Sequence, residues 1–226
     1  MFITLEGVEG SGKSTQAALL TARLADMGRA VQRTREPGGT PLADATRALL
    51  LHPAAALDAL VAAGLAPGGD TADEPVLPVT ELFLLAAARA QHVARIHGWL
   101  GAGAVVVCDR FADATRAYQG YGRGLDLGVI AAVERMATGG LHPDLTLLFD
   151  LPAEEGQRRK RLAHATGGEW NRLDAEALGF HDRVRAGYLA LAATDPARWV
   201  VLDARRDPAA VAALVWDAVA PHLTPA

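Results

Sequence analysis

The chain has 226 residues, of which 50% are hydrophobic and 21% charged, a composition typical of a globular protein with an apolar core. Its formal net charge of -4 lacks the basic excess that a nucleic acid polymer usually requires of its partner. Cys108 is the only cysteine, which excludes an internal disulfide framework and predicts a reducing compartment, by default the cytoplasm.

No run of about 18 consecutive apolar residues occurs, so we expect neither a membrane span nor a membrane partner. The length suits one α/β domain, and we expect residues 1–226 to form a single domain. Lys13 and Lys160 are the only lysines among the 22 basic residues. A lysine that persists in such a sequence indicates a place that needs a compact ammonium instead of a planar guanidinium.

Five short apolar runs alternate with longer helical stretches along the chain. The runs at 2–6, 30–34, 104–109, 145–150 and 199–203 predict five strands. Several of them are apolar at consecutive positions, as in strands that are covered on both faces. The alternation therefore predicts an α/β fold, with a parallel five-stranded sheet and helices on both of its faces.

Helical periodicity fills most of the segments between these runs. The first predicted helix follows Gly12 and ends before Gly28, with apolar residues at three- and four-residue spacing. Later helices are predicted at 41–50, 81–100, 127–137, 154–162, 175–193 and 208–219. Residues 53–78 are rich in alanine, glycine and proline, and they predict an irregular excursion with a turn at 67–70 and room for a short helix at 57–63.

Polar or charged residues stand at the carboxyl ends of four of the predicted strands. These residues are Glu6, Arg35 with Glu36, Asp109 with Arg110, and Asp150. Open α/β sheets bind their ligands at the carboxyl ends of the strands. We therefore expect candidate binding groups along one edge of the molecule.

The segment 7–14 reads GVEGSGKS and matches the phosphate-binding pattern G-x-x-x-x-G-K-[ST], between a predicted strand and a predicted helix. Its glycines let backbone N–H groups turn towards phosphate oxygens at the helix N-terminus. We expect Lys13 to reach the β- and γ-phosphates of ATP and Ser14 to bind Mg²⁺. The predicted nucleotide-binding residues are Gly7, Val8, Glu9, Gly10, Ser11, Gly12, Lys13, Ser14 and Thr15.

The phosphate-binding pattern alone does not separate kinases from GTPases and ATPases. No N-K-x-D tetrad for guanine follows a predicted strand, and the nearest string, NRLD at 171–174, lies in a basic segment. Arg110 follows Asp109 where a hydrolase would place an acid suited to activating water. Transfer to a bound acceptor is therefore favoured over hydrolysis.

Seven sequence blocks together resemble the thymidylate kinases. They are GVEGSGKST at 7–15, TREPGGT at 34–40, ARAQH at 88–92, DRF at 109–111, AYQGYGRG at 117–124, HPDLT at 142–146 and NRLD at 171–174, in the family order. The resemblance implies the nucleoside monophosphate kinase fold of the P-loop proteins. It also implies transfer of the terminal phosphoryl group of ATP to dTMP, with Mg²⁺, by a cytoplasmic homodimer.

The resemblance implies roles for the residues around the phosphates. Arg110 would hold the phosphate of dTMP with its guanidinium fork, and Asp109 would reach the metal through water. Glu36 would lie near the water shell of the metal and Arg35 near the phosphate. Arg47 completes the acceptor-binding residues on this side of the site.

The resemblance also implies how the sugar and base of the acceptor are read. Arg89 would contact a thymine carbonyl, and Thr115 would read the ring N–H with Gln119 nearby. Tyr118 would crowd the ribose and disfavour a 2′-hydroxyl. Glu9 has no duty in cradling phosphate and would face the 3′-hydroxyl of the acceptor sugar.

A basic run at 158–161 lies inside the segment 154–172, which resembles the lid of the family. Members that have no basic residue at x positions of the phosphate-binding loop supply catalytic arginine from this lid, and GVEGSGKS contains no arginine. We favour Arg159 and Arg161 as these catalytic residues and leave Arg158 open. Arg172 would assist from the far side of the lid.

Two alternatives remain at the level of the sequence. Leu85 stands where the family stacks a phenylalanine on thymine, which leaves open a kinase for another pyrimidine monophosphate. The second alternative is a P-loop ATPase or a nucleotide-binding regulatory module without a small acceptor. That alternative leaves Arg89, Arg110 and Tyr118 without a purpose.

Overall fold

One parallel sheet organises the computed structural model, which describes residues 1–67 and 75–223. Its strands are β1 (Phe2–Glu6), β2 (Val31–Arg35), β3 (Val105–Asp109), β4 (Leu145–Asp150) and β5 (Trp199–Asp203). They run in the order β2-β3-β1-β4-β5, and all neighbouring pairs are parallel. The predicted fold class and five strands are confirmed, although β2 and β3 each begin one residue later than predicted.

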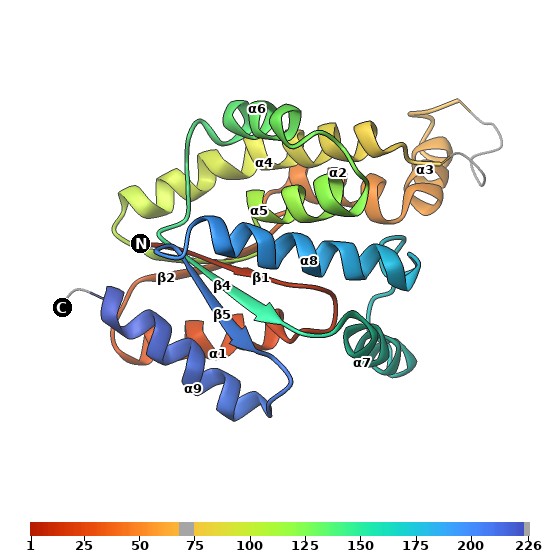
Figure 1. The fold of residues 1–226 in the computed structure, drawn as a ribbon. Helices are drawn as coiled ribbons and strands as arrows, with labels where there is room; N and C mark the ends of the chain where they lie inside the picture. Colours follow the sequence, from red (N-terminus) through yellow and green to blue (C-terminus); the bar gives the residue numbers. More distant parts are fainter. Residues whose placement is uncertain (68–74, 224–226) are drawn as a thin grey trace.

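Helices cover both faces of this sheet. They are α1 (Lys13–Asp26), α2 (Pro41–Leu51), α3 (Pro53–Ala62), α4 (Pro78–Gly101), α5 (Ala112–Thr115), the π-helix η1 (Arg116–Gly122), α6 (Leu127–Thr138), α7 (Ala153–Ala165), α8 (Leu178–Thr194), α9 (Pro208–Val219) and the 3-10 turn η2 (Ala220–His222). Figure 1 shows α1 and α9 on one face, and α4, α5, α6 and α8 on the other. Helix α7 lies beyond the carboxyl end of β4, at the edge where the binding groups were expected.

Burial explains why the strand predictions succeed. Every residue of β1 is buried, and the only residue of β4 that is not buried is its last. Consecutive apolar residues are stable in such strands because helices exclude water from both faces. Ile3 and Leu5 belong to the core cluster shared with α1, α8 and α9, whereas Phe2 belongs to a second cluster with α4 and meets Phe111 edge-on at 5.0 Å.

Two segments differ from the prediction. The excursion at 53–78 is not irregular throughout, because α3 begins at Pro53, where the missing N–H costs nothing in the first helical turn. Helix α3 buries none of its residues, and the predicted turn at 67–70 lies outside the described residues from 68 onward. Helices α5 and η1 were not predicted at all. None of the described helices is by itself long and apolar enough to cross a membrane, and only α2 and α3 pass such a test together, with a bend of 116° between them.

Candidate active site

A cleft of about 260 Å³ opens at the carboxyl ends of the strands. Fourteen of the residues predicted to bind ligands line it, namely Glu9, Gly10, Lys13, Ser14, Arg35, Glu36, Arg47, Leu85, Arg89, Asp109, Arg110, Thr115, Tyr118 and Gln119. Seven other predicted residues are outside its lining, namely Gly7, Val8, Ser11, Gly12, Thr15, Arg159 and Arg161. Groups from distant parts of the sequence thus face one shared space.

The loop between β1 and α1 is built to receive an anion. Gly12 caps α1 with a φ of 90°, which favours glycine, and neither a capping side chain nor an acidic residue occupies the first turn. The Lys13 ammonium donates to Gly7 O at 3.0 Å and to Val8 O at 2.8 Å. Burial and the nearby Arg110 guanidinium lower the pKa of Lys13 to about 8. A phosphate would supply the negative charge that this ammonium lacks among the loop carbonyls.

Ser14 and Asp109 lie together at the mouth of this loop. The Ser14 hydroxyl donates to Asp109 Oδ2 at 2.6 Å. Among the described residues no three acidic, histidine or cysteine side chains form a metal-binding group. This sparse donor set fits Mg²⁺, which keeps several waters and takes its other ligands from a nucleotide.

Arg110 has a strained backbone that aims its side chain into the cleft. Its φ of 69° is unusual for a residue other than glycine. The guanidinium donates to Gly7 O at 2.9 Å and to the Tyr188 hydroxyl at 3.1 Å through Nη1, and to Glu9 Oε1 at 3.1 Å through Nη2. It also lies over the ring of Tyr118, 4.8 Å from the centroid. The arrangement holds a planar cation at a fixed place before any anion arrives.

Glu9 faces the same space as a carboxylate. Its Oε1 accepts from the Tyr118 hydroxyl at 2.6 Å as well as from Arg110. Burial alone would raise the pKa of Glu9, but Arg110, His181, Lys13 and Tyr118 outweigh it and lower this pKa well below its usual range. Glu9 is therefore ionised in the folded protein at neutral pH.

Arg89 is the buried cation on the base side of the cleft, with 2% of its surface exposed. Its Nε donates to Glu36 Oε2 at 2.8 Å, and Nη2 donates to Phe111 O at 3.2 Å. The other Glu36 oxygen contacts His92 Nδ1 at 3.0 Å. Because both Glu36 oxygens have protein partners, this residue serves Arg89 in the structure, and its implied place near metal-bound water stays a prediction.

Two neighbours of Arg89 offer different groups to a ligand. Thr115 is 1% exposed, and its hydroxyl has no hydrogen-bond partner among the described residues. A buried hydroxyl without a partner is costly, and a ligand donor or acceptor would satisfy it. Leu85 lines the cleft, whereas Phe83 is exposed on α4 and does not replace it.

Glu81 does not line the cleft, but it accepts hydrogen bonds from several polar side chains, among them Gln119, which does line it. Glu81 has no exposed surface, and its carboxylate accepts from Gln119 at 2.9 Å, from Arg123 at 2.9 Å and from Arg172 at 2.7 Å. Arg172 also donates to Leu50 O at 3.2 Å. The structure thus ties Arg172 to α2 and α4, so the suggestion that it assists from the lid stays a prediction.

The first turn of α7 touches the phosphate-binding loop. A Cβ on Gly10 would lie 2.2 Å from Gly156 O, and one on Gly156 would lie 2.4 Å from Glu9 O, so only glycines allow this approach. Arg159 donates to Glu155 at 2.8 Å and to Ala204 O at 3.0 Å, and Arg161 is exposed. Of the basic run at 158–161, the residue that lines the cleft is Lys160.

Lys160 is one of the functional candidates that sequence reasoning missed. Its ammonium lies 3.3 Å from Asp174 Oδ2. The scarcity of lysine was a usable signal for Lys160, as it was for Lys13. Glu169 also borders the cleft, where it pairs with Arg47 at 3.1 Å. No sequence signal marked Glu169, since an acid in a polar segment is ordinary.

Glu6, which the sequence marked only as a polar residue at the end of a strand, shares the Tyr188 hydroxyl with Arg110. Its Oε1 accepts from the Phe111 N–H and its Oε2 from the Tyr188 hydroxyl, both at 2.8 Å. Burial, together with the charge of Asp113, raises the pKa of Glu6 from 4.5 to about 8, although Arg110 opposes this. Glu6 is therefore neutral over much of the range in which exposed glutamates are charged.

This raised pKa predicts a pH dependence of stability. A group whose pKa rises on folding contributes stability fully below its unfolded pKa of 4.5, and that stability is lost as the pH rises through about 8. We expect the free energy of unfolding of the wild type to fall between about pH 5 and about pH 9 more steeply than that of Glu6→Gln, which is always neutral. Urea unfolding of both proteins across this range measures the difference. Parallel pH profiles would contradict the assignment.

Comparisons with known proteins give matches to one family. A family model described as thymidylate kinase matches residues 5–66 and 71–215. Thymidylate kinase of Trichlorobacter lovleyi is 47% identical over 226 residues, covering 99% of this chain and 98% of that protein. Thymidylate kinase of Thermomicrobium roseum is 49% identical over 219 residues, covering 96% of this chain and 93% of that protein. The crystal structure of thymidylate kinase from Ehrlichia chaffeensis has a TM-score of 0.67 at 31% identity and covers 96% of this chain and 97% of that one.

Proposed function

Because the chain belongs to the thymidylate kinase family, we propose that it uses ATP with Mg²⁺ to phosphorylate dTMP. It is a nucleoside monophosphate kinase, and its product dTDP serves the synthesis of dTTP. The observation that carries the proposal is the single cleft lined by Lys13, Arg110 and Arg89. In this proposal Lys13 binds the phosphates of ATP, Arg110 binds the phosphate of dTMP, and Arg89 binds the base.

The chemistry needs positioning and positive charge more than a base. Both reactants are anions, and the attacking oxygen of a monophosphate already carries charge, so in-line alignment supplies most of the rate. Lys13 and the N-terminus of α1 support the donor phosphates, and Arg110 supports the acceptor phosphate. Mg²⁺ bound near Ser14 and Asp109 would neutralise charge on the donor phosphates.

Selection of the acceptor follows from the opposite wall of the cleft. Arg89 is kept in place by Glu36 and presents its guanidinium towards a base carbonyl. The unpartnered Thr115 hydroxyl can accept from a ring N–H. Glu9 and Tyr118 form one hydrogen-bonded pair for the sugar, which favours a deoxyribose with a 3′-hydroxyl.

The lid arginines complete the proposed machinery. We expect the double variant Arg159→Ala with Arg161→Ala to lower kcat by about 10²-fold or more while the Kd for dTMP changes little, since these cations act on the transferring group. Steady-state kinetics and calorimetric dTMP binding measure the two effects.

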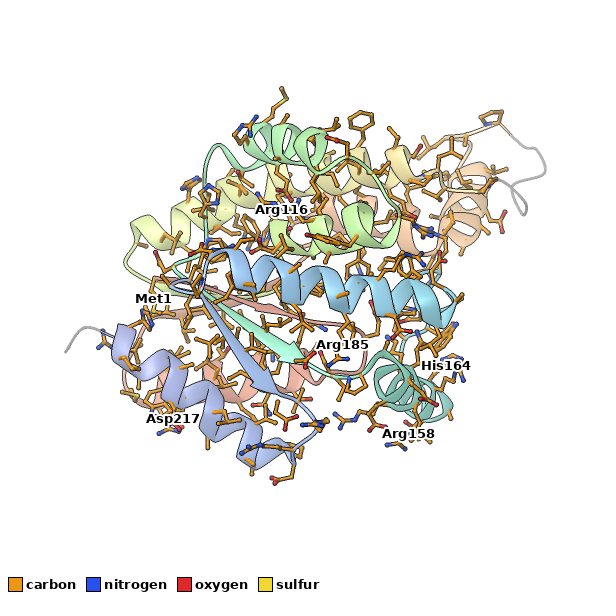
Figure 2. The ribbon with its side chains drawn as sticks, in the orientation of Figure 1. Met1, Arg116, Arg158, His164, Arg185 and Asp217 are labelled. Atoms are coloured by element: carbon orange, nitrogen blue, oxygen red, sulfur yellow. The ribbon has the colours of Figure 1, made fainter. Side chains whose placement is uncertain are left out.

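Arg158 supplies the matched comparison for the lid variant. It pairs with Glu155, and Figure 2 shows it on the outer side of α7. An equal fall in kcat for Arg158→Ala, or an unchanged kcat in the double variant, would contradict the roles given to Arg159 and Arg161.

Three broader features belong to the same proposal. The chain acts as one domain with a lid at 154–172, and the buried Cys108 suits the cytoplasm. It acts as a homodimer, which is supported by exposed apolar side chains on α4 and α6, among them Val79, Phe83, Val129 and Met136. Sedimentation velocity of the purified protein tests the dimer.

A substrate panel tests the function itself. With ATP and Mg²⁺, dTMP should be phosphorylated with a kcat/KM well above those of dUMP and dCMP, and ATP hydrolysis without an acceptor should be slow. Leu85 lines the cleft where an aromatic ring would restrict the base, so dUMP is the competitor to measure first. Equal use of dUMP would redirect the proposal to another pyrimidine monophosphate.

A further inference from the structure

Helix α8 reaches Glu9, one of the residues that line the cleft, through a histidine that no motif singled out. His181 is 1% exposed, and its Nδ1 lies 3.2 Å from Glu9 Oε2. On the other side of the ring, Nε2 lies 2.6 Å from Gln157 Nε2 in the first turns of α7. The imidazole therefore bridges the base of the lid helix and the acid of the phosphate-binding loop.

The surroundings of Gln157 determine which nitrogen of His181 carries the proton. Gln157 Nε2 also donates to Asp174 O at 3.2 Å. A backbone carbonyl only accepts, so the side-chain atom that faces it is the amide nitrogen, which has two hydrogens to donate. The second hydrogen points at His181 Nε2, which must then be the acceptor. The ring proton is left on Nδ1, directed at Glu9.

The contacts of Glu9 show what this proton does. Oε1 is occupied by Tyr118 and Arg110, and Oε2 accepts no well-aligned hydrogen bond within the described part of the chain. The His181 N–H lies 3.2 Å from Oε2 by its nitrogen, and its attraction for this oxygen opposes rotation of the carboxylate. Oε2 itself is buried, so its contact with His181 sets the direction in which the rest of the Glu9 carboxylate faces the cleft.

We propose that His181, as the neutral tautomer protonated at Nδ1, is a positioning residue that orients the Glu9 carboxylate towards the 3′-hydroxyl of the acceptor. Gln157 and the Asp174 carbonyl hold the tautomer, so the start of the lid segment and a residue just beyond its end both contribute to the orientation. The inference rests on the function proposed above through the role of Glu9. It adds a determinant of sugar selectivity that itself does not touch the substrate.

Two substitutions separate the two nitrogens. Asparagine at 181 can place an amide N–H near the position of Nδ1 and leaves Gln157 without a partner. Glutamine reaches the position of Nε2 and leaves Glu9 without its donor. Both variants lose the ring and its edge-on contact with Phe180, 5.3 Å between centroids, so they share the cost of lost packing.

The measured quantity is the ratio of kcat/KM for dTMP to kcat/KM for 3′-deoxy-dTMP. We expect His181→Gln to lower this ratio by about tenfold or more, as for loss of a hydrogen bond to a charged group, and His181→Asn to stay near the wild-type ratio. An unchanged ratio in His181→Gln would overturn the proposal. So would an equal loss in both variants, because that result would mean a packing role only.

A spectroscopic test needs no turnover. In ¹⁵N-labelled wild-type protein at about pH 7, His181, identified by its absence in the His181→Asn spectrum, should show a protonated Nδ1 and an unprotonated Nε2. A protonated Nε2 would overturn the proposal. If the wild type failed to phosphorylate dTMP, the proposed function would fall, whereas this tautomer test would still stand by itself.

Discussion

Replacing Lys13 by alanine is expected to lower kcat for phosphoryl transfer by about 10³-fold or more. Lys13 is the first residue of α1, and its ammonium is now bonded to Gly7 O, Val8 O and Ser11 Oγ. In the complex with ATP it would exchange these acceptors for phosphate oxygens and follow the charge that develops during transfer. Steady-state kinetics with saturating dTMP measures the loss.

The controls for Lys13→Ala address folding and charge. Urea unfolding should show a change of only about 1 kcal/mol for the lost hydrogen bonds, so the loss of kcat cannot come from unfolding. Lys13→Arg keeps the charge but replaces the compact ammonium with a planar fork, and we expect it to remain strongly impaired. Near-normal turnover in either variant would contradict the role of Lys13.

The lowered pKa of Lys13 adds a pH signature to the same assignment. Because the pKa of Lys13 in the free enzyme is about 8, its ammonium loses a proton as the pH rises through that value. We expect kcat/KM for ATP to fall above about pH 8 in the wild type. Lys13→Arg should not show this fall, since a guanidinium stays protonated.

The second large effect is expected for Arg110→Ala, which should lower kcat/KM for dTMP by about 10³-fold or more. Removal of the guanidinium takes away the proposed clamp on the acceptor phosphate. It also leaves the Glu9 carboxylate facing that phosphate without its cation. The Kd for ATP should change much less, and calorimetric titration of each nucleotide measures the contrast.

Arg116 provides the matched control for Arg110. It pairs with the buried Glu134 at 2.7 Å and lies outside the cleft lining, in the position that Figure 2 labels. Arg116→Ala should therefore lower stability without weakening dTMP binding selectively. If both arginine variants lost dTMP binding equally, the effect would be structural and the clamp would be refuted.

Strands and the phosphate-binding loop could be predicted because short-range physics determines them. Buried strands require runs of apolar residues, and the turn from β1 into α1 requires Gly12 before Lys13. Helices α5 and η1 escaped prediction because the glycines and polar residues of 112–122 show no helical period. Their backbone is stabilised by tertiary packing, mainly between η1 and α8.

The same distinction between local and long-range determinants separates the site residues that were predicted from those that were missed. Residues inside sequence blocks, such as Arg89, Arg110 and Tyr118, were placed in the cleft by resemblance, and the structure brings them together. His181 and Tyr188 were missed because each reads as part of the apolar face of α8. Their contacts with Glu9 and Arg110 join segments that are distant in the chain, and no local pattern encodes such pairs.

The hydrogen bonds that meet at Glu81 limit which substitutions this sequence can accept during evolution. Three donors, from Gln119, Arg123 and Arg172, share one fully buried carboxylate. Loss of that acid would leave Arg172 without an acidic partner among the described residues and Arg123 with Glu176 alone, and breaking such a buried pair costs about 3–5 kcal/mol. In a library of random variants, position 81 should therefore tolerate replacement as poorly as a substrate contact, and rare survivors should carry second changes at 123 or 172.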